Sequence, residues 1–371
     1  MTSGTTSTSW LYAVNLDVEM QRPPRVAVIL VNYKDYAQRF LAPCYESLRA
    51  QSYSKEQITL FIVDNASTDQ TQSILKRLAP DARILPNAEN LGWAGGNNVA
   101  IRLALQEGFD YMVSLNMDTV LDQDWLKNLV EEAERKQEIH ILQSKILLHG
   151  TDKINSLGNR IQFLGYGYCN GYGEKISSST GPYSIDFASG ASMMVKREVF
   201  ERVGLFREEY FLYGDDLEFC WRARLAGYRI GLVEKSICYH KYNFRSILNA
   251  LFYVERNRLL TLLTLEKWGT LLLVLPGLLL FQIGACIYFS LHGKGRVMMQ
   301  VIRYFLQPRA WKFIRDRRRE IRLLRTQRDA QIVRGFSGRI VFAEIRSVPF
   351  HLLVNPLLWL YWNVVRLFIV W

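Results

Sequence analysis

The chain has 371 residues, of which 49% are hydrophobic, and it carries a formal net charge of +11 at pH 7. This length suits one large domain with an appendage, or two domains, and the apolar content is ample for a core. The five cysteines are odd in number and scattered, which argues against a disulfide framework or a zinc site and fits a reducing compartment.

The first 24 residues are predicted to form a flexible leader that ends at Pro23 and Pro24. The opening residues, MTSGTTSTSW, lack the basic start and the apolar run of a secretory signal. We therefore expect the folded part of the chain to remain in the cytosol.

Strand and helix patterns alternate over residues 25–149. Continuous apolar runs predict strands at 26–33, 58–65 and 111–115, each buried on both faces, with a short strand at 82–85. Helical patterns fall near 35–50, at 69–78 behind the capping residues Ser67 and Thr68, and at 95–106. This alternation predicts an α/β fold with a parallel sheet and helices on both faces.

Polar residues directly follow three of these apolar runs. Ligands of such sheets bind beyond the carboxyl ends of the strands, so these residues are the first candidates for a binding site. They are Asn32, Tyr33, Asp64, Asn65 and residues 116–118.

Residues 150–245 have a different character. Glycines and tyrosines at 158–173 predict hairpins and a mobile loop, residues 177–182 predict a turn, and residues 187–195 predict a strand that enters a helix at 197–203. An amphipathic helix is then predicted from Asp215 to Ala226, with Leu217, Cys220, Trp221, Arg224 and Leu225 on its packed face.

Two acidic residues, Asp215 and Asp216, start this helix, and the lone His240 follows a later strand-like run. Together with Asp118 they provide what a metal-assisted, base-catalysed transfer needs: a cation ligand, a proton acceptor and a histidine. Two simpler interpretations stay open, because Asp is favoured as a helix cap and a lone histidine is usually structural.

Beyond residue 245 the chain becomes apolar and then basic. Residues 270–291 contain no charged residue and are long enough to cross a bilayer, although a buried core helix is the alternative. Pro276 and Gly277 lie inside this run and would bend a helix. A second apolar run, 349–371, is rich in aromatic residues that suit the headgroup interface.

Residues 292–347 carry fifteen basic and four acidic residues. Their net charge of +11 equals the formal net charge of the whole chain. A single membrane crossing by 270–291 would put this block outside the cytosol, against the positive-inside rule. We therefore expect a re-entrant or monotopic attachment bent at Pro276 and Gly277, with a two-span hairpin as the alternative. The apolar stripe Val297, Met298, Val301, Ile302 and Phe305 is expected to lie in the interface, beside anionic lipid.

Seven short motifs together resemble family-2 inverting glycosyltransferases, especially the rhamnosyltransferase-like branch, over roughly residues 25–245. They are VILVNY (28–33), VDNASTD (63–69), NLGWAGGNN (90–98), LNMDT (115–119), ASGASMMV (188–195), FLYGDDLEFCWRARLAGY (211–228) and YHKY (239–242). The resemblance implies a GT-A fold, with a Rossmann-like nucleotide-binding half and an acceptor half. A membrane-associated helical tail, 246–371, would follow it.

The resemblance also implies roles for individual residues. The nucleotide–sugar would be bound by Asn32, Tyr33, Asp64, Asn65, Asn90, Gly92, Gly95, Asn97 and Asn116, with Asp64 on the base and Gly96 adding close backbone approach. Ser189, Gly190 and Ala191 would form the floor of the sugar or acceptor site. Trp93 and Trp221 would either stack on a sugar there or pack in the core.

The catalytic roles follow in the same way. Asp118 and His240 would hold Mg²⁺ or Mn²⁺ at the diphosphate, although Asn116 stands where the family usually has a first Asp. Asp216 would be the general base and Asp215 its neighbour, where the family more often has Glu. Glu218 and Arg222 would support the pair or the acceptor.

The sequence therefore predicts an enzyme at the cytoplasmic face of the membrane that moves a sugar, plausibly rhamnose, from a nucleotide diphosphate to a saccharide or polyprenyl-linked acceptor of a cell-surface polymer. One alternative is a processive polysaccharide synthase, although the QxxRW motif of those enzymes is absent and QPRAW (307–311) has the wrong order. A pyrophosphorylase would need a glycine-rich N-terminal signature. A non-catalytic scaffold and a nucleic-acid binder are the non-enzyme alternatives, and no nucleic acid is expected as a partner.

Overall fold

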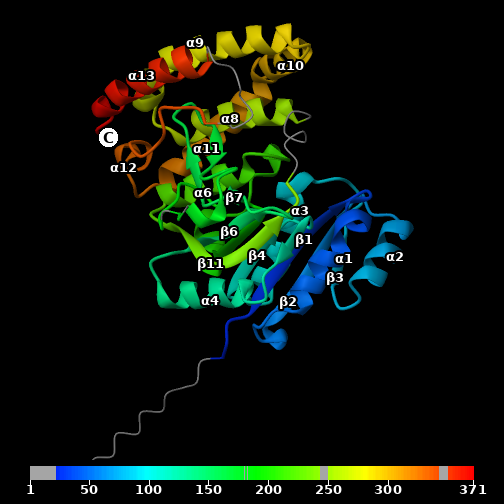
Figure 1. Ribbon diagram of the computed structural model, residues 1–371. Coiled ribbons are helices and arrows are strands. Elements are labelled where there is room, and N and C mark those ends of the chain that lie inside the picture. The colour runs from blue at the N-terminus through cyan, green and yellow to red at the C-terminus, as the bar shows by residue number, and fades with distance from the viewer. Residues whose placement is uncertain (1–21, 179, 182, 243–249, 342–349) are drawn as a thin grey trace, which may run out of the picture.

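The computed structural model describes residues 22–178, 180–181, 183–242, 250–341 and 350–371 (Figure 1). Most of the predicted leader, and part of the predicted basic block, therefore lie outside the described residues. A nine-stranded sheet forms the centre of the molecule.

The first half of this sheet is parallel, as the apolar runs predict. Its strands are β1 (Val26–Tyr33), β2 (Ile58–Asn65), β3 (Arg83–Pro86) and β4 (Tyr111–Leu115), in the order β3-β2-β1-β4. Helices cover both faces. Ala27 and Ile29 of β1 face α3 (Gly92–Gln106), whereas Val26, Val28 and Leu30 face α1 (Tyr36–Arg49) and α4 (Trp125–Arg135). Because successive side chains of β1 are buried on opposite faces, the strand reads as one apolar run.

The second half of the sheet is mixed, and it lies beyond the four strands for which a parallel arrangement was predicted. β10 (Ser192–Lys196) lies antiparallel between β4 and β6 (Ile141–Leu148). β11 (Ile230–His240) runs parallel to β6 and antiparallel to β5 (Thr119–Leu121), and β7 (Ile154–Ser156) pairs with β6. β8 (Asn159–Ile161) and β9 (Gly167–Cys169) form a separate hairpin, and α5 (Arg197–Val203) and α2 (Asp69–Leu78) complete the predicted elements.

The helix α6 (Asp215–Leu225) is buried on nearly every side, so the predicted amphipathic pattern is wrong. Its outer face is covered by the C-terminal part of the chain. Trp221 is 1% exposed and meets the ring of Phe336 edge-on, with ring centroids 4.7 Å apart. Trp221 is therefore a core residue and not part of a sugar floor.

The C-terminal region is helical and lies at one end of the molecule (Figure 1). It consists of α8 (Leu251–Leu265), α9 (Trp268–Leu291), α10 (Gly295–Phe305), α11 (Pro308–Leu324), α12 (Asp329–Val333), the π-helix Phe350–Val354 and α13 (Asn355–Phe368). Its Ile321, Val333 and Trp362 belong to the same hydrophobic core as Ile29 of β1. The predicted boundary at residues 245 and 246 itself lies outside the described residues, and the described parts on its two sides share this core.

The helix α9 continues through Pro276, so the predicted re-entrant hairpin is wrong. The Pro276–Gly277 pair instead forms a notch for α13. A Cβ at Gly277 would lie 2.7 Å from the ring of Tyr361, and the Tyr361 hydroxyl donates to the carbonyl of Leu273 at 2.6 Å. This hydrogen bond joins α13 to α9 one residue after Leu272, whose carbonyl lacks a helical donor because Pro276 has no N–H.

The helices α10 and α11 return from α9 onto the rest of the protein. Met298 and Val301 are buried there against protein, whereas Ile302 is 45% exposed, so only part of the stripe expected in the lipid interface is free to meet it. Arginines of α11 and the segment after it bind the end of α8: Arg318 donates to the carbonyls of Leu263 and Glu266, and Arg325 donates to that of Leu265. Cations are favourable at this end of a helix.

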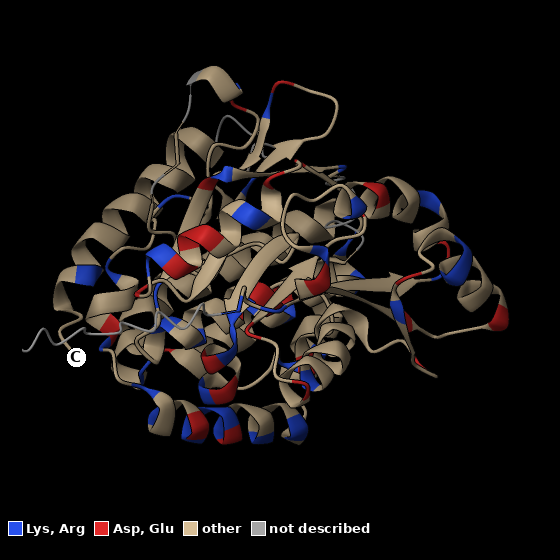
Figure 2. Ribbon diagram, turned by 90° about the horizontal axis from the view of Figure 1, so that it is seen from below, with Lys and Arg blue, Asp and Glu red and all other residues tan. Residues whose placement is uncertain are grey.

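Figure 2, seen from the side opposite α9, shows basic and acidic residues interspersed over the elements of that side. The charge of the chain is therefore not gathered on this face in a block of one sign.

Candidate active site

The loop after β4 and the end of β11 place Asp118 and His240 side by side. Pairing of β11 with β5 sets His240 opposite Thr119, and the backbone N–H of Lys241 donates to the carbonyl of Asp118 at 2.9 Å. His240 Nε2 lies 3.2 Å from Asp118 Oδ1. The structure therefore brings together the two residues predicted to hold a metal.

Asn155 of β7 orients this histidine. Its Oδ1 lies 2.9 Å from His240 Nδ1, and both side chains are buried. With the proton assigned to Nδ1, this contact leaves the Nε2 lone pair facing Asp118. Sequence reasoning missed Asn155, because a polar residue in a three-residue strand carries no recognisable signal.

This pair suits a divalent cation. Asp118 Oδ1 is buried and accepts no hydrogen bond, so it holds an unused lone pair beside the His240 nitrogen. Carboxylate oxygen and imidazole nitrogen are ligands that Mn²⁺ accepts. In the described part of the chain, no group of three or more His, Cys, Asp or Glu side chains is placed to hold a metal. A cation here would take its remaining ligands from a bound molecule or water.

The second acidic pair lies at the start of α6. Asp216 Oδ2 accepts from the backbone N–H of Gly190 at 3.1 Å, and its Oδ1 accepts from that of Leu217 at 2.8 Å. Asp215 Oδ1 accepts from the N–H of Asp216 at 3.1 Å, while its Oδ2 is buried without a partner.

The two carboxyl groups differ in their tendency to ionise. Burial raises the pKa of Asp215 to about 8, and the neighbouring charge of Asp216 adds to the rise. Burial also raises the pKa of Asp216, but the N–H groups of Gly190 and Leu217 oppose that rise. At neutral pH we therefore assign the negative charge to Asp216 and the proton to Asp215.

Several contacts connect the two acidic pairs into one site. Trp93 Nε1 donates to Asn116 Oδ1 at 3.3 Å, and the N–H of Asn116 donates to the carbonyl of Ala191 at 3.1 Å. The ring of Trp93 packs so closely on Gly190 that a Cβ there would lie 2.4 Å from it.

The phenol of Tyr213 lies near both pairs. Burial raises its pKa to about 12, and the charges of Asp215 and Asp118 both contribute. Burial, followed by the Asp118 carboxylate, likewise raises the pKa of Tyr36, which places that phenol beside the Asp118–His240 pair.

Ser189, Gly190 and Ala191, predicted as the floor of the sugar or acceptor site, precede β10 and include a turn beside this site, with Ser189 partly exposed. The N–H of Ser189 donates to Gln143 Oε1 at 2.8 Å, which anchors the turn to β6. Its N–H contact with Asp216 therefore supports a place beside the reacting groups.

The predicted nucleotide pocket differs from expectation, because most of its polar side chains point inward. Asp64 has no exposed surface, and its carboxylate accepts from Asn32 at 2.7 Å, Ser67 at 2.7 Å and Thr71 at 2.6 Å. A nucleotide base could reach this carboxylate only if its neighbours moved. The structure gives Asp64 the role of joining the ends of β1 and β2 to the start of α2.

Two more predicted pocket residues are also internal. Asn65 is 1% exposed, donates to the carbonyl of Gly92 at 3.0 Å and accepts from Asn87 at 2.9 Å. Asn97 is also 1% exposed and donates to the carbonyl of Trp93 at 2.9 Å. The predicted residues with exposed or partly exposed side chains are Tyr33, Asn90 and Asn116.

The glycines of this region serve close packing. Gly92 has a positive φ of 70°, and a Cβ there would lie 2.2 Å from the carbonyl oxygen of Phe211. A Cβ at Gly95 would lie 2.8 Å from Leu91, and one at Gly96 would lie 2.8 Å from Val31. The lack of side chains in this region lets α3 pack closely against the sheet and the loop before α6. The prediction was that these glycines would allow close approach to a ligand.

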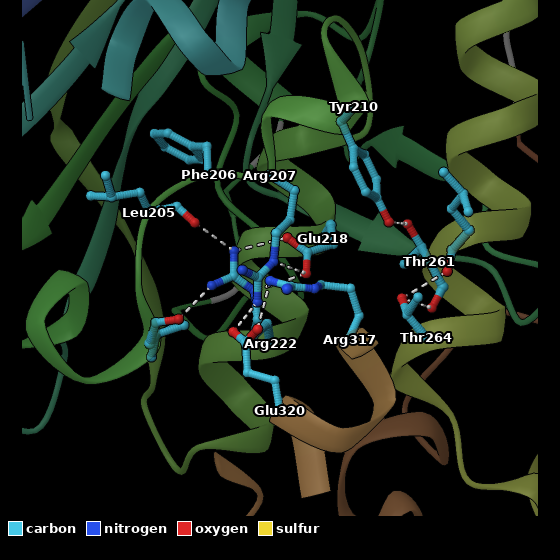
Figure 3. A network of polar contacts seen from close by, with 12 residues as sticks. Leu205, Phe206, Arg207, Tyr210, Glu218, Arg222, Thr261, Thr264, Arg317 and Glu320 are labelled. Carbon is cyan, nitrogen blue, oxygen red and sulfur yellow. Dashed lines mark hydrogen bonds and ion pairs between the residues drawn. The ribbon is translucent and has the colours of Figure 1, made fainter. Parts of the chain in front are cut away.

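Glu218 and Arg222 form part of a buried network (Figure 3). Arg222 Nε and Nη2 donate to Glu218 at 2.8 and 2.9 Å, and Nη1 donates to the carbonyl of Val203 at 2.6 Å. Arg207 reaches the same Glu218 and also pairs with Glu320 of α11. Glu218 and Arg222, which were predicted to support the aspartate pair or the acceptor, therefore have a structural role, because their network links α6 to α11.

The chain is similar to several known proteins. Residues 27–204 match the family described as Glycosyl transferase family 2. The chain is 25% identical over 224 residues to the low-salt glycan biosynthesis hexosyltransferase Agl10 of Haloferax volcanii, covering 60% of this chain and 68% of that one. It is 24% identical over 212 residues to poly-beta-1,6-N-acetyl-D-glucosamine synthase of Staphylococcus aureus, covering 54% and 48% respectively. The match thus spans about half of that synthase.

The solved structure of GalNAc-T7 with UDP, GalNAc and Mn²⁺ has the same fold. It matches with a TM-score of 0.53 and 12% identity over 67% of this chain and 49% of that one. These relatives give no support to the rhamnosyltransferase-like branch. Residues 27–204 are therefore similar to Glycosyl transferase family 2, and the molecule has a GT-A-like fold.

Proposed function

We propose that this protein transfers a sugar from a nucleotide-diphosphate donor to an acceptor hydroxyl with inversion of configuration. One observation carries the proposal: the Asp118–His240 pair and the Asp215–Asp216 pair are joined into one site, because the N–H of Asn116 donates to the carbonyl of Ala191 and the N–H of Gly190 donates to Asp216. A hydroxyl-activating base and a site for the donor's diphosphate are the two parts that such a transfer requires.

In the proposed reaction Asp216 takes the proton of the acceptor hydroxyl. The oxygen of that hydroxyl bonds to the anomeric carbon as the bond to the diphosphate breaks, so a single in-line displacement inverts the carbon. The N–H groups of Gly190 and Leu217 hold the ionised carboxylate in place. Asp215 keeps its own proton, so a second negative charge does not oppose the ionised base.

Asp118 and His240 would hold a divalent cation, Mg²⁺ or Mn²⁺. The GalNAc-T7 structure was solved with Mn²⁺ and UDP, which agrees with this expectation. When bound, the cation neutralises charge that develops on the departing nucleoside diphosphate. The exposed Tyr33 and the partly exposed Asn90 and Asn116 are the candidates for contact with the donor.

The transferred sugar is expected to be a hexose or an N-acetylhexosamine, as the names of the two curated relatives suggest. Rhamnose remains one member of the panel to be tested. The acceptor is proposed to be a saccharide or a lipid-linked saccharide. The likeness to a poly-N-acetylglucosamine synthase favours a processive synthase as the second candidate, which would release long products instead of adding one sugar.

We further propose that the protein lies on the cytoplasmic face of a membrane, with α9 and α13 in the plane of the interface. Leu272, Leu280 and Leu291 of α9 are 68–80% exposed, and Leu357 and Leu367 of α13 are also exposed. α9 is the one helix among the described residues that is long and apolar enough to span a bilayer. Because α10 packs on both α9 and α8, an in-plane position explains the structure better than a crossing does.

Charge supports the same attachment. Arg296, Arg303, Arg309 and Lys312 of α10 and α11 are exposed, and α10 packs against α9. Basic residues beside an apolar surface favour anionic lipid headgroups.

The function is tested with full-length protein in detergent, Mn²⁺ or Mg²⁺, a panel of UDP-, GDP- and dTDP-sugars, and saccharide acceptors. Release of nucleoside diphosphate and the length of the product are measured. We expect one donor to give acceptor-dependent release that falls about 10²–10⁴-fold in Asp216→Asn, with donor binding retained. Equal release by wild type and this variant would reject the base assignment, and long products would favour the synthase.

A further inference from the structure

The loop that leads into the paired aspartates is strained. Phe211 and Tyr213 have positive φ angles of 63° each, and Gly214 follows with 77°. A residue other than glycine in this region costs about 1–3 kcal/mol, and the cost is met only when surrounding structure fixes the loop. Tyr213 and Gly214 directly precede Asp215, so whatever holds this loop also fixes the start of α6.

One side chain of the C-terminal region makes three hydrogen bonds to the backbone of this loop. Asn257 of α8 is fully buried, and its amide nitrogen donates to the carbonyls of Tyr210 at 2.9 Å, Leu212 at 3.0 Å and Tyr213 at 2.6 Å. Its Oδ1 accepts from the guanidinium of Arg256 at 2.8 and 2.9 Å. That contact fixes which end of the amide faces the loop, because a guanidinium can only donate.

Other contacts press the same loop between two elements. The ring of Phe211 stacks on Tyr253 of α8, with centroids 5.1 Å apart and planes 21° apart. On the other side, the carbonyl of Phe211 accepts from the N–H of Trp93 at 2.7 Å. Arg256 adds donors to the carbonyls of Glu209 and Tyr210. The loop is thus fixed by α3 on one side and by α8 on the other.

We propose that Asn257 is a positioning residue for the Asp215–Asp216 pair, and that α8 therefore completes the active site. The proposal rests on the proposed function of that pair. Asn257 touches no reacting group itself. It binds three backbone carbonyls of the strained loop, and so keeps the carboxylate of Asp216 directed toward the acceptor. Residue 257 lies outside the segment 27–204 that matches the family, so this support comes from the helical region of the chain.

The test compares Asn257→Ala with Asn355→Ala in the full-length protein. Asn355 is also buried in the C-terminal region and also binds the backbone of another segment, at Ile340, but it contacts nothing in the active site. We expect Asn257→Ala to lower kcat by about 10–100-fold while the donor KM stays within about twofold, since small displacements of a catalytic group have large effects. Asn355→Ala is expected to leave both constants unchanged.

Two further variants make the test specific. Asn257→Asp has nearly the same shape and still accepts from Arg256, but it cannot donate to the three carbonyls, so we expect a loss of kcat at least as large. Tyr253→Leu removes the stack on Phe211 and the ring contact with Arg256 from a partly exposed position, and we expect a smaller loss of kcat at constant KM. If Asn257→Ala fails to fold, Tyr253→Leu decides, and an unchanged kcat in that variant overturns the proposal.

A readout without turnover separates this proposal from the proposed function. Amide hydrogen exchange of residues 210–216 should become faster in Asn257→Ala than in Asn355→Ala. If wild type transfers no sugar from any donor, the proposed function fails, whatever the exchange shows. If wild type is active but the two Ala variants share its kcat and its exchange, the function stands and the role of Asn257 is rejected.

Discussion

The proton on Asp215 leads to a prediction about stability as well as about chemistry. Its folded-state pKa of about 8 lies well above its ordinary value of 3.8. The folded protein therefore keeps a proton that the unfolded chain releases above about pH 4. Binding of a proton to the folded state alone means that the free energy of unfolding falls as pH rises through this window.

The size of the effect follows from the same two values. Each pH unit between about 4 and 8 costs up to about 1.4 kcal/mol of stability, with an upper bound of about 6 kcal/mol over the whole window. Sharing of the proton with Asp216 reduces this bound. Asp215→Asn removes the titration but keeps an oxygen that accepts from the N–H of Asp216. We expect the variant to gain stability relative to wild type as pH rises from 5 to 8.

The assay is the thermal unfolding midpoint of both proteins between pH 4 and pH 9. The control is Asp186→Asn: Asp186 is buried too, but it pairs with Arg224 at 3.1 Å, so its loss should lower the midpoint at pH 8. If the curves of wild type and Asp215→Asn run parallel across this range, Asp215 does not hold the extra proton. The division of roles between the two aspartates would then be wrong.

Three other changes test separate parts of the site and the surface. Asn155→Ala should weaken Mn²⁺ binding about 10–100-fold, measured by calorimetry with nucleoside diphosphate present, because His240 loses its orienting partner; unchanged affinity would remove Asn155 from the site. Gly190→Ala should cost about 1–3 kcal/mol in thermal unfolding and reduce transfer, because its Cβ would overlap Trp93; normal activity would contradict the tight contact. Leu280→Glu should reduce flotation with anionic vesicles without changing activity in detergent, and equal flotation would reject the α9 surface.

Much of the fold could be predicted because burial on both faces leaves a clear pattern. β1 and β2 coincide with the apolar runs, and Thr68 caps α2 as predicted. The direction of the strands beyond β4 could not be predicted, since antiparallel β10 is as apolar as its parallel neighbours. The predicted amphipathic pattern of α6 failed for a related reason: Phe219, on the side that was expected to be exposed, packs against Phe200 and Phe206.

The site could be located from the sequence, but the direction of its side chains could not. Polar residues at strand ends mark the correct edge of the sheet, yet Asp64 turns inward to Ser67 and Thr71 while Asp118 meets His240. Asp64 is within β2 and Asp118 lies just after β4, and in both cases the packing of the following segment decides which way the side chain points. Asn257 was invisible for another reason, because it lies 42 residues beyond Asp215 in a helix with no motif.

The arginines that close the carbonyl end of α8 change how the net charge of the chain should be interpreted. Arg318 and Arg325 donate hydrogen bonds to backbone carbonyl oxygens, and Arg325 also pairs with Asp329. Because these guanidinium groups bind backbone oxygens of the protein itself, they are poorly placed to bind phospholipid headgroups. A salt titration of vesicle association should consequently reveal an effective valence well below the +11 formal charge.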